Sequence, residues 1–352
     1  MKKNIFFASF AAGMQFIVKD ILERQISDIK INQLFDGAVL FETGKTYDRL
    51  NTHCFNNIFS VITFAENKNP NNIEPFIRRI INSRPQDEII FGNAKKCNTF
   101  RIVVSLENQL VSIDNVLKTK LEKLISSQSR LQVDRGKSDV EFWILSRAEG
   151  FCYFMKRLSK HTAYEKILNK GELHPEIAFL MNWFADADKD DVLLDPFCGN
   201  GPVPLTRALH FPAKQIYAFD IDKAMLNIVR QKIASKKSLS NMSNLAVEQI
   251  DIKDLDRKLP AESVDKIVTD PPWGMYENIK MGIEEFYKLA ILKMSKVLKP
   301  DGIIVLLISR KIDIEAVLKE FHDLRVMQNF NVLVSGKKAN LVKLKKTNAG
   351  AT

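Results

Sequence analysis

Between residues 192 and 308, short apolar segments of strand length alternate with amphipathic segments of helical length. The strand candidates are Val192–Leu194, Gln215–Phe219, Leu245–Gln249, Lys266–Thr269 and Ile303–Ile308. The helical patterns are Pro202–Leu209, Ala224–Ser235 and Ile283–Leu298. Because strands joined by helical crossovers lie parallel, this alternation predicts a doubly wound, mostly parallel sheet.

The segments that follow change this pattern. Val326–Val334 and Ala339–Leu344 are apolar-rich, and only the four residues Ser335 to Lys338 separate them. A parallel pair would need a crossover of a dozen or more residues, so this short connection predicts an antiparallel hairpin. For residues 176–346 we therefore expect an α/β, Rossmann-like domain whose mostly parallel sheet ends in an antiparallel hairpin.

The first half of the chain has weaker patterns and is expected to contain two smaller parts. Residues 1–95 combine short strands with helical patterns, which indicates an α+β domain. Residues 96–160 form a second α/β section, in which Ser112 is the expected N-cap of a helix that runs to Leu124. Residues 161–175 are mostly polar and are interpreted as a linker.

The chain is basic, with a formal net charge of +10. Residues 1–160 carry 24 Lys and Arg against 17 Asp and Glu, whereas the remainder carries 28 against 25. A positive balance favours a polyanionic partner such as RNA, contacted by the first half, although a merely basic surface would give the same count.

The cysteines and the apolar runs bear on location and on metals. The cysteines are Cys54, Cys97, Cys152 and Cys198, and none forms a Cys-x-x-Cys pair. Neither a metal site nor a disulfide framework is therefore expected, and scattered thiols suit a cytoplasmic location. No apolar run reaches about 18 residues, so we expect no membrane partner.

The first chemical motif runs from Asp195 to Pro202, between a strand and a helix. Gly199 and Gly201 allow the backbone to approach a ligand closely. The exposed N–H groups at the start of the following helix favour an anionic or polar cofactor. A P-loop is excluded because no Gly-Lys-Ser/Thr follows.

Three further aspartates follow predicted strands. Asp220 ends the second strand, where a carboxylate can accept both hydroxyls of a cofactor ribose. Asp222 follows two residues later, and the simpler interpretation is that it caps the next helix and binds no ligand. Asp251 follows the third strand and could accept from an adenine amino group, although a loop aspartate is more often only a turn former.

The fourth motif, Asp270-Pro271-Pro272-Trp273-Gly274, directly follows the fourth strand. Two consecutive prolines have a fixed φ and no N–H, so the segment projects its carbonyls rigidly. A carboxylate, a carbonyl and an aromatic plane together form a receptor for a flat base that bears an amine. A proline turn with a buried tryptophan is the alternative, and the position after three other sites disfavours it.

Together these motifs resemble a known family. Asp195–Gly201, followed by Asp270–Gly274, resembles the class I, Rossmann-like methyltransferases that act on nucleic-acid amino groups. Within them, the chain resembles the THUMP-containing tRNA and rRNA guanine-N2 methyltransferases. Residues 96–160 resemble a THUMP RNA-binding module, residues 1–95 its accompanying ferredoxin-like domain, and Gly171–Ala178 the helix that borders the cofactor pocket.

The resemblance implies an enzyme that transfers a methyl group from S-adenosylmethionine to N2 of a guanosine in RNA, most of all tRNA. The cofactor-binding residues that it implies are His174, Asp195, Phe197, Gly199, Gly201, Asp220, Ile221, Asp251 and Ile252. The catalytic residues that it implies are Asp270, Pro271, Pro272 and Trp273. Among these, the Asp270 carboxylate and the Pro271 carbonyl would orient the amine while Trp273 stacks on the base.

The chain departs from the family pattern at three positions. Asn200 and Pro202 stand where Ser and Thr are usual, and Trp273 stands where Tyr or Phe is commoner. Because Asp-Pro-Pro-Trp also occurs in adenine-N6 methyltransferases, an RNA adenine-N6 methyltransferase is one alternative, and an rRNA guanine-N2 methyltransferase is another. A catalytically inactive RNA-binding protein is a third, against which the intact Asp220 and Asp270 argue.

Overall fold

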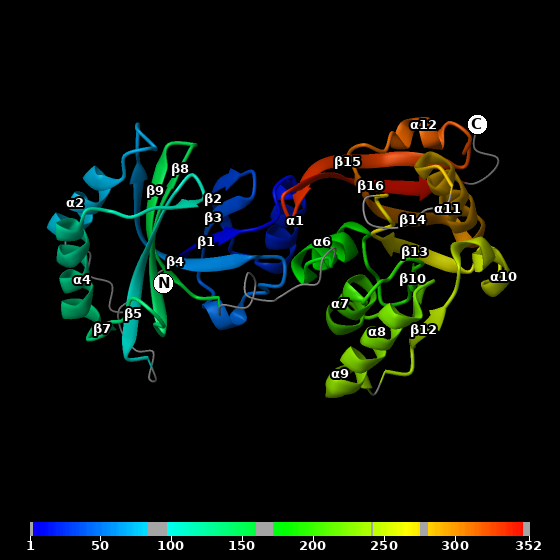
Figure 1. The fold of residues 1–352 in the computed structure, drawn as a ribbon, viewed down its shortest axis with the longest axis horizontal. Helices are drawn as coiled ribbons and strands as arrows, with labels where there is room; N and C mark the ends of the chain where they lie inside the picture. Colours follow the sequence, from blue (N-terminus) through cyan, green and yellow to red (C-terminus); the bar gives the residue numbers. More distant parts are fainter. Residues whose placement is uncertain (1–2, 84–96, 160–171, 241, 275–280, 348–352) are drawn as a thin grey trace. The chain divides into compact units, whose positions relative to one another are not determined.

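The structure is a computed structural model of the chain, and it consists of two compact units (Figure 1). The residues that it describes are 3–83, 97–159, 172–240, 242–274 and 281–347. The N-terminal unit comprises Met1–Ser9 and Ile26–Lys166, and the C-terminal unit comprises Phe10–Gln25 and Ile167–Thr352. Among the described residues, no helix is long and apolar enough to cross a membrane.

The N-terminal unit is built on one sheet, with the described strands in the order β2-β3-β1-β4-β9-β8-β5-β6 and β7 paired to β5. The strands are β1 (Asn4–Ser9), β2 (Lys30–Phe35), β3 (Ala38–Thr43), β4 (Asn57–Glu66), β5 (Thr99–Leu106), β6 (Gln109–Leu110), β7 (Gln132–Val133), β8 (Val140–Arg147) and β9 (Phe151–Arg157). Two helices, α2 (Glu74–Ser83) and α4 (Asn115–Ser129), pack on one face through a core that includes Ile77, Leu121 and Phe142.

Both ranges that were expected to be separate domains contribute to this sheet, because β4 pairs with β9. The expected boundary at residue 95 falls outside the described residues, and the division stays a prediction. The expected N-cap Ser112 is wrong. Asp114 caps α4, since its carboxylate accepts from the backbone N–H groups of Val116 and Leu117, and a carboxylate caps a helix as well as a hydroxyl does.

The C-terminal unit contains a second sheet in the order β12-β11-β10-β13-β14-β16-β15. The strands are β10 (Val192–Asp195), β11 (Gln215–Asp220), β12 (Leu245–Gln249), β13 (Val264–Thr269), β14 (Leu298–Ser309), β15 (Leu324–Val334) and β16 (Lys337–Lys346). The strands from β10 to β14 are parallel, and β16 pairs antiparallel with both β14 and β15. The predicted mostly parallel sheet with a terminal antiparallel hairpin is confirmed.

Helices cover both faces of this sheet (Figure 1). Their bounds are α6 (Pro175–Phe184), α7 (Pro202–His210), α8 (Lys223–Ser235), α9 (Lys237–Ser240), α10 (Leu255–Lys258), α11 (Ile283–Val297) and α12 (Ile314–Leu318). One core joins α10, α11 and α12 to residues such as Leu194 and Phe219. On the other face, Leu226 of α8 packs with Ala218 of β11. Because successive side chains of a strand face opposite sides, the neighbours Ala218 and Phe219 serve different cores.

The helix α1 (Gln15–Gln25) belongs to the C-terminal unit, although it follows the first strand of the N-terminal sheet. Asp20 accepts a 2.8 Å hydrogen bond from the indole of Trp183, and the N–H of Leu333 donates to the Ala12 carbonyl over 3.0 Å. At Gly13 the backbone has φ +91°, and an added Cβ would lie 1.9 Å from the Asn331 carbonyl oxygen. The C-terminal unit is therefore assembled from two separate pieces of the chain.

Candidate active site

Three neighbouring parallel strands end at one edge of the C-terminal sheet. In the order β11-β10-β13, the first two end in Asp220 and Asp195, while Asp270 directly follows β13. Because the carboxyl ends of parallel strands meet at the same edge, the topology brings these three carboxylates together. This edge is where ligands bind in doubly wound sheets, so we take it as the candidate active site.

Asp195 shapes the start of the glycine-containing loop. Its Oδ1 accepts from the backbone N–H of Phe197 over 3.2 Å and from the hydroxyl of Thr269 over 2.6 Å. Burial raises the pKa of Asp195 to about 8. The negative charges of Asp220 and Asp270 raise this pKa further, whereas the two hydrogen bonds lower it. Asp195 is thus a buried brace between β10 and β13, and its neutral form is favoured at neutral pH.

Asp220 ties the loop to the next strand. Its Oδ2 accepts from the N–H of Gly199 over 2.7 Å, and its Oδ1 accepts from the N–H of Asp222 over 2.8 Å. Burial raises the pKa of Asp220 against these backbone hydrogen bonds, which lower it. The Asp222 carboxylate accepts from the N–H of Ala224 and so caps α8, which confirms the simpler interpretation of that residue.

The two glycines of the loop have different roles. Gly199 has φ +50°, and a Cβ added there would meet nothing within 4 Å, so the backbone borders open space. Gly201 has φ +88°, and an added Cβ would lie 3.0 Å from Val229, so this position must be small for α8 to pack. Gly199 therefore leaves room for a ligand, whereas Gly201 allows the loop to turn into α7.

Two further turns lie beside Asp220. The N–H of Ile250 donates to the Asp220 carbonyl, which places the following residue, Asp251, next to it. Asp251 caps a short 3-10 helix by accepting from the N–H of Lys253 over 3.0 Å. Ile221 is 62% exposed, whereas Ile252 is only 7% exposed and packs in the core. A ligand at this place would meet the Ile221 side chain but only the backbone of Ile252.

The segment before α6 is tied to the glycine-containing loop. Lys232 of α8 donates to Glu172 over 3.1 Å and to the carbonyl of Asn200 over 3.0 Å. His174 is the N-cap residue of α6, although its side chain makes no capping hydrogen bond. Sequence reasoning missed Lys232, because a lysine on an amphipathic helix gives no sign of the carbonyl that it reaches.

The loop from Asp270 to Trp273 is held from two sides. The indole N–H of Trp273 donates to Oδ1 of Asp270 over 2.8 Å and to the carbonyl of Leu307 over 3.3 Å. The hydroxyl of Tyr287, a residue that is only 1% exposed, donates to the Pro272 carbonyl over 3.0 Å. Tyr287 was also missed, and its only sign in the sequence is a polar group on the apolar face of the following helix.

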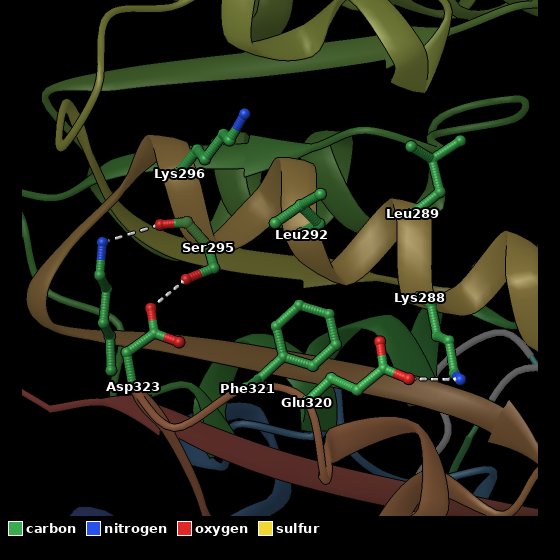
Figure 2. Close-up of a pocket in the computed structure, with 9 residues that line it drawn as sticks. Lys288, Leu289, Leu292, Ser295, Lys296, Glu320, Phe321 and Asp323 are labelled. Atoms are coloured by element: carbon green, nitrogen blue, oxygen red, sulfur yellow. Dashed lines mark hydrogen bonds and ion pairs between the residues drawn. The ribbon is translucent and has the colours of Figure 1, made fainter.

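A cavity of about 420 Å³ lies between α11 and the segment that precedes β15 (Figure 2). Leu289, Leu292 and Phe321 form its apolar part. Four of its polar residues pair with each other, since Lys288 contacts Glu320 over 2.6 Å and Ser295 donates to Asp323 over 2.6 Å. None of the residues predicted to bind cofactor or substrate lines this cavity.

These features define a class I, Rossmann-like methyltransferase. The parallel sheet ends in an antiparallel hairpin, a glycine-containing loop follows β10, and an acidic residue ends β11. Sequence comparison agrees with this class. Residues 163–340, half of the chain, match the family described as the RMKL-like methyltransferase domain, and the chain belongs to that family. The methyl donor of such enzymes is S-adenosylmethionine.

Individual relatives are similar over about two fifths of the chain. A probable tRNA (guanine(10)-N2)-dimethyltransferase of Methanothermococcus thermolithotrophicus is 34% identical over 139 residues, which are 39% of this chain and 82% of that protein. A tRNA (guanine(6)-N2)-methyltransferase of Thermus thermophilus is 30% identical over 42% of each chain. The chain therefore aligns with less than half of the second relative.

A solved structure extends the likeness in fold to nearly the whole chain. The crystal structure of TrmN from Thermus thermophilus matches with a TM-score of 0.77 and 18% identity, covering 97% of this chain and 99% of that one. At this identity the match concerns the fold alone. The expected α/β architecture, with a methyltransferase domain preceded by an α+β region, is thus confirmed.

Proposed function

We propose that this protein is an S-adenosylmethionine-dependent RNA methyltransferase that methylates N2 of a guanosine, with tRNA as its substrate. The observation that carries the proposal is the Asp270 carboxylate at the end of β13, on the same sheet edge as Asp195 and Asp220. Both relatives are named as tRNA guanine-N2 methyltransferases, the first as a probable one, which favours guanine over adenine as the target base. A cytoplasmic location stays a prediction.

The residues present fit the cofactor. Gly199 leaves open space beside the backbone, and Asp220 lies half-buried at the end of β11, where a ribose would be bound. Asp251 and the exposed Ile221 lie where an adenine would be received. His174 and the backbone from Phe197 to Gly201 remain the candidates for the methionine part. When bound, S-adenosylmethionine supplies an electrophilic methyl group on a sulfonium sulfur.

Asp270 carries the chemistry on the substrate side. The lone pair of guanine N2 is delocalised into the ring, so the amine is a poor nucleophile until its hydrogens are oriented. The Asp270 carboxylate and the Pro271 carbonyl accept those hydrogens and direct the lone pair toward the methyl group. As the N–C bond formed, the bond between the methyl group and the sulfonium sulfur would break and leave a neutral thioether, and the nitrogen would lose a proton to the Asp270 carboxylate. Most of the acceleration is then alignment and electrostatics.

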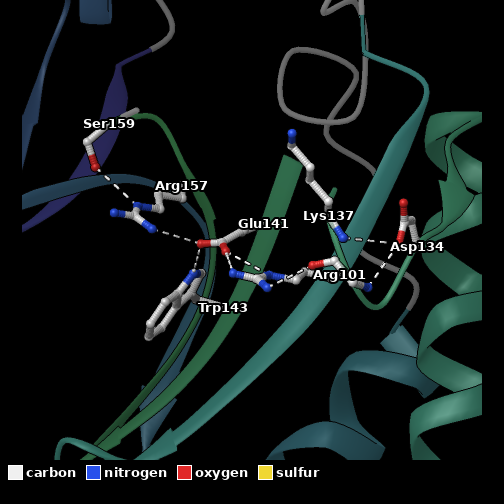
Figure 3. Close-up of polar contacts among 8 residues, drawn as sticks. Arg101, Asp134, Lys137, Glu141, Trp143, Arg157 and Ser159 are labelled. Carbon is white, nitrogen blue, oxygen red and sulfur yellow. Dashed lines mark hydrogen bonds and ion pairs between the residues drawn. The ribbon is translucent and has the colours of Figure 1, made fainter. Parts of the chain in front are cut away.

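We assign RNA binding to the basic first half, where Figure 3 shows a cluster of charged residues around Glu141. Glu141 accepts from Arg101 and from the indole of Trp143 over 2.9 Å, and Arg157 donates to it over 3.0 Å. Burial alone would raise the pKa of Glu141. Hydrogen bonds from Trp143, Arg101 and Arg157 nevertheless hold this pKa below its ordinary value. Two guanidinium groups thus share one carboxylate, which leaves a local positive charge on β5, β8 and β9. The THUMP assignment of this region stays a prediction.

The test is nucleoside analysis after methylation by the full chain. Bulk tRNA and, separately, rRNA are incubated with labelled S-adenosylmethionine, digested and resolved. We expect N2-methylated guanosine from tRNA, and at least about 10²-fold less from Asp270→Asn. Asp313→Asn is the matched control, because Asp313 only caps α12. N6-methyladenosine would overturn the guanine assignment, and full activity of Asp270→Asn would overturn the assignment of the catalytic loop.

A further inference from the structure

The indole ring of Trp273 is fixed by hydrogen bonds from the N–H group at its edge. Its N–H lies 2.8 Å from Oδ1 of Asp270 and 3.3 Å from the carbonyl of Leu307 on β14. The indole therefore links the catalytic carboxylate to the backbone of the neighbouring strand. A phenylalanine or tyrosine at this position has no donor at the corresponding edge of its ring.

A carboxylate at the end of a strand can rotate about its side-chain bonds, and a fixed donor restricts that rotation. A hydrogen bond from the indole to one oxygen of Asp270 sets the plane of the carboxylate and so the direction of its other oxygen. The residues between Asp270 and Trp273 cannot easily adjust, because both are prolines and Tyr287 holds the Pro272 carbonyl from α11.

We infer that Trp273 is a positioning residue that acts through Asp270, orienting the carboxylate toward the substrate amine by means of its indole N–H. This inference rests on the proposed function and adds a role that stacking on the base does not include. The two roles predict different outcomes. Stacking needs only an aromatic ring and tolerates phenylalanine, whereas positioning needs the N–H and does not.

The hydrogen bond can be tested without any activity. The chain has three tryptophans, and each donates to a different carboxylate: Trp143 to Glu141, Trp183 to Asp20 and Trp273 to Asp270. In full-length protein labelled with 15N-tryptophan, Asp270→Asn should shift the indole N–H resonance of Trp273 alone, and Asp20→Asn that of Trp183 alone. An unmoved Trp273 resonance would overturn the inference, whether or not the protein methylates guanosine.

The kinetic test compares Trp273→Phe with Trp183→Phe in the full chain. Loss of alignment should lower the kcat of Trp273→Phe about 10- to 100-fold, with KM for tRNA and for S-adenosylmethionine changed less than about threefold. Trp183→Phe removes an equivalent indole–carboxylate bond far along the chain from the catalytic loop, and it should leave kcat unchanged. An unchanged kcat for Trp273→Phe, or a fall confined to KM for tRNA, would overturn the inference.

A double-mutant cycle separates positioning from general damage. In the Asp270→Asn background the carboxylate is already gone, so Trp273→Phe should change kcat less than about threefold. The same factor in both backgrounds would mean that Trp273 acts independently of Asp270, and the inference would fail. If the wild-type chain forms no N2-methylguanosine but the resonance of Trp273 still responds to Asp270→Asn, the proposed function fails while the contact stands.

Discussion

Replacing Asp195 by asparagine should remove a large part of the pH dependence of unfolding in the C-terminal unit. Asp195 is fully buried, and its burial raises its pKa from 3.8 to about 8 in the folded protein. A carboxyl group whose pKa is raised on folding stabilises the protein fully below the unfolded pKa, and this contribution is lost as the pH rises through the folded pKa. The contribution of Asp195 to stability is therefore lost between about pH 4 and about pH 8.

The size of the effect follows from the shift. Each pKa unit corresponds to about 1.4 kcal/mol, so the full shift sets a ceiling of about 5–6 kcal/mol between the two ends of the window. Local relaxation around a buried charge lowers this figure, and we expect about 2–4 kcal/mol. Asparagine keeps an oxygen for the Thr269 hydroxyl and the Phe197 N–H but cannot ionise.

The measurement is urea unfolding at pH 4.5 and pH 8.5, followed by tryptophan fluorescence in chains that carry Trp143→Phe, so that the remaining tryptophans report on the C-terminal unit. Between the lower and the higher pH, the free energy of unfolding of Asp195→Asn should rise by about 2–4 kcal/mol relative to that of wild type. Asp222→Asn is the control, because this exposed cap keeps its function as asparagine. Parallel pH profiles for wild type and Asp195→Asn would refute the argument.

Three other predictions concern the cofactor, the packing of the N-terminal helix and RNA. Asp220→Asn should weaken S-adenosylmethionine binding about 10- to 100-fold in calorimetry, because its carboxylate orders the Gly199 N–H; unchanged affinity would contradict this. Gly13→Ala should destabilise the C-terminal unit by about 2–5 kcal/mol in thermal unfolding, whereas Gly336→Ala, which meets nothing within 4 Å, should cost only about 1–3 kcal/mol. The tRNA affinity should fall with salt with a slope of about −3 to −5 in log–log form, as expected for four to six phosphates, and a slope near zero would exclude phosphate contacts.

The strands and the strand-end residues of the C-terminal unit could be predicted because their signals are local. A strand between two turns shows its own apolar pattern, and Asp220 ends its strand while Asp270 directly follows its own in the sequence. Contacts that depend on packing between distant segments carry no such signal. The bonds of Lys232 to Asn200 and of Tyr287 to Pro272 depend on how α8 and α11 lie against the sheet.

The assignment of α1 illustrates the same limit. Its amphipathic pattern indicates that one side of the helix is buried. The pattern does not say which sheet buries it, and the order of the chain suggests the N-terminal one. The two partners that decide the matter, Trp183 and Leu333, are specified by parts of the sequence with no local relation to it.

This arrangement has a consequence for the order in which the protein is made. Ala12 and Gly13 meet β15 at Leu333 and Asn331, about 320 residues later, and at about 5–20 residues per second a ribosome needs tens of seconds to supply that strand. During this interval the segment at Ala12 and Gly13 is synthesised but lacks its partner strand. A message that ends before β15 would yield a chain in which this segment and the edge of β14 lack their partner strands, so premature termination should give an aggregating product rather than a shortened enzyme.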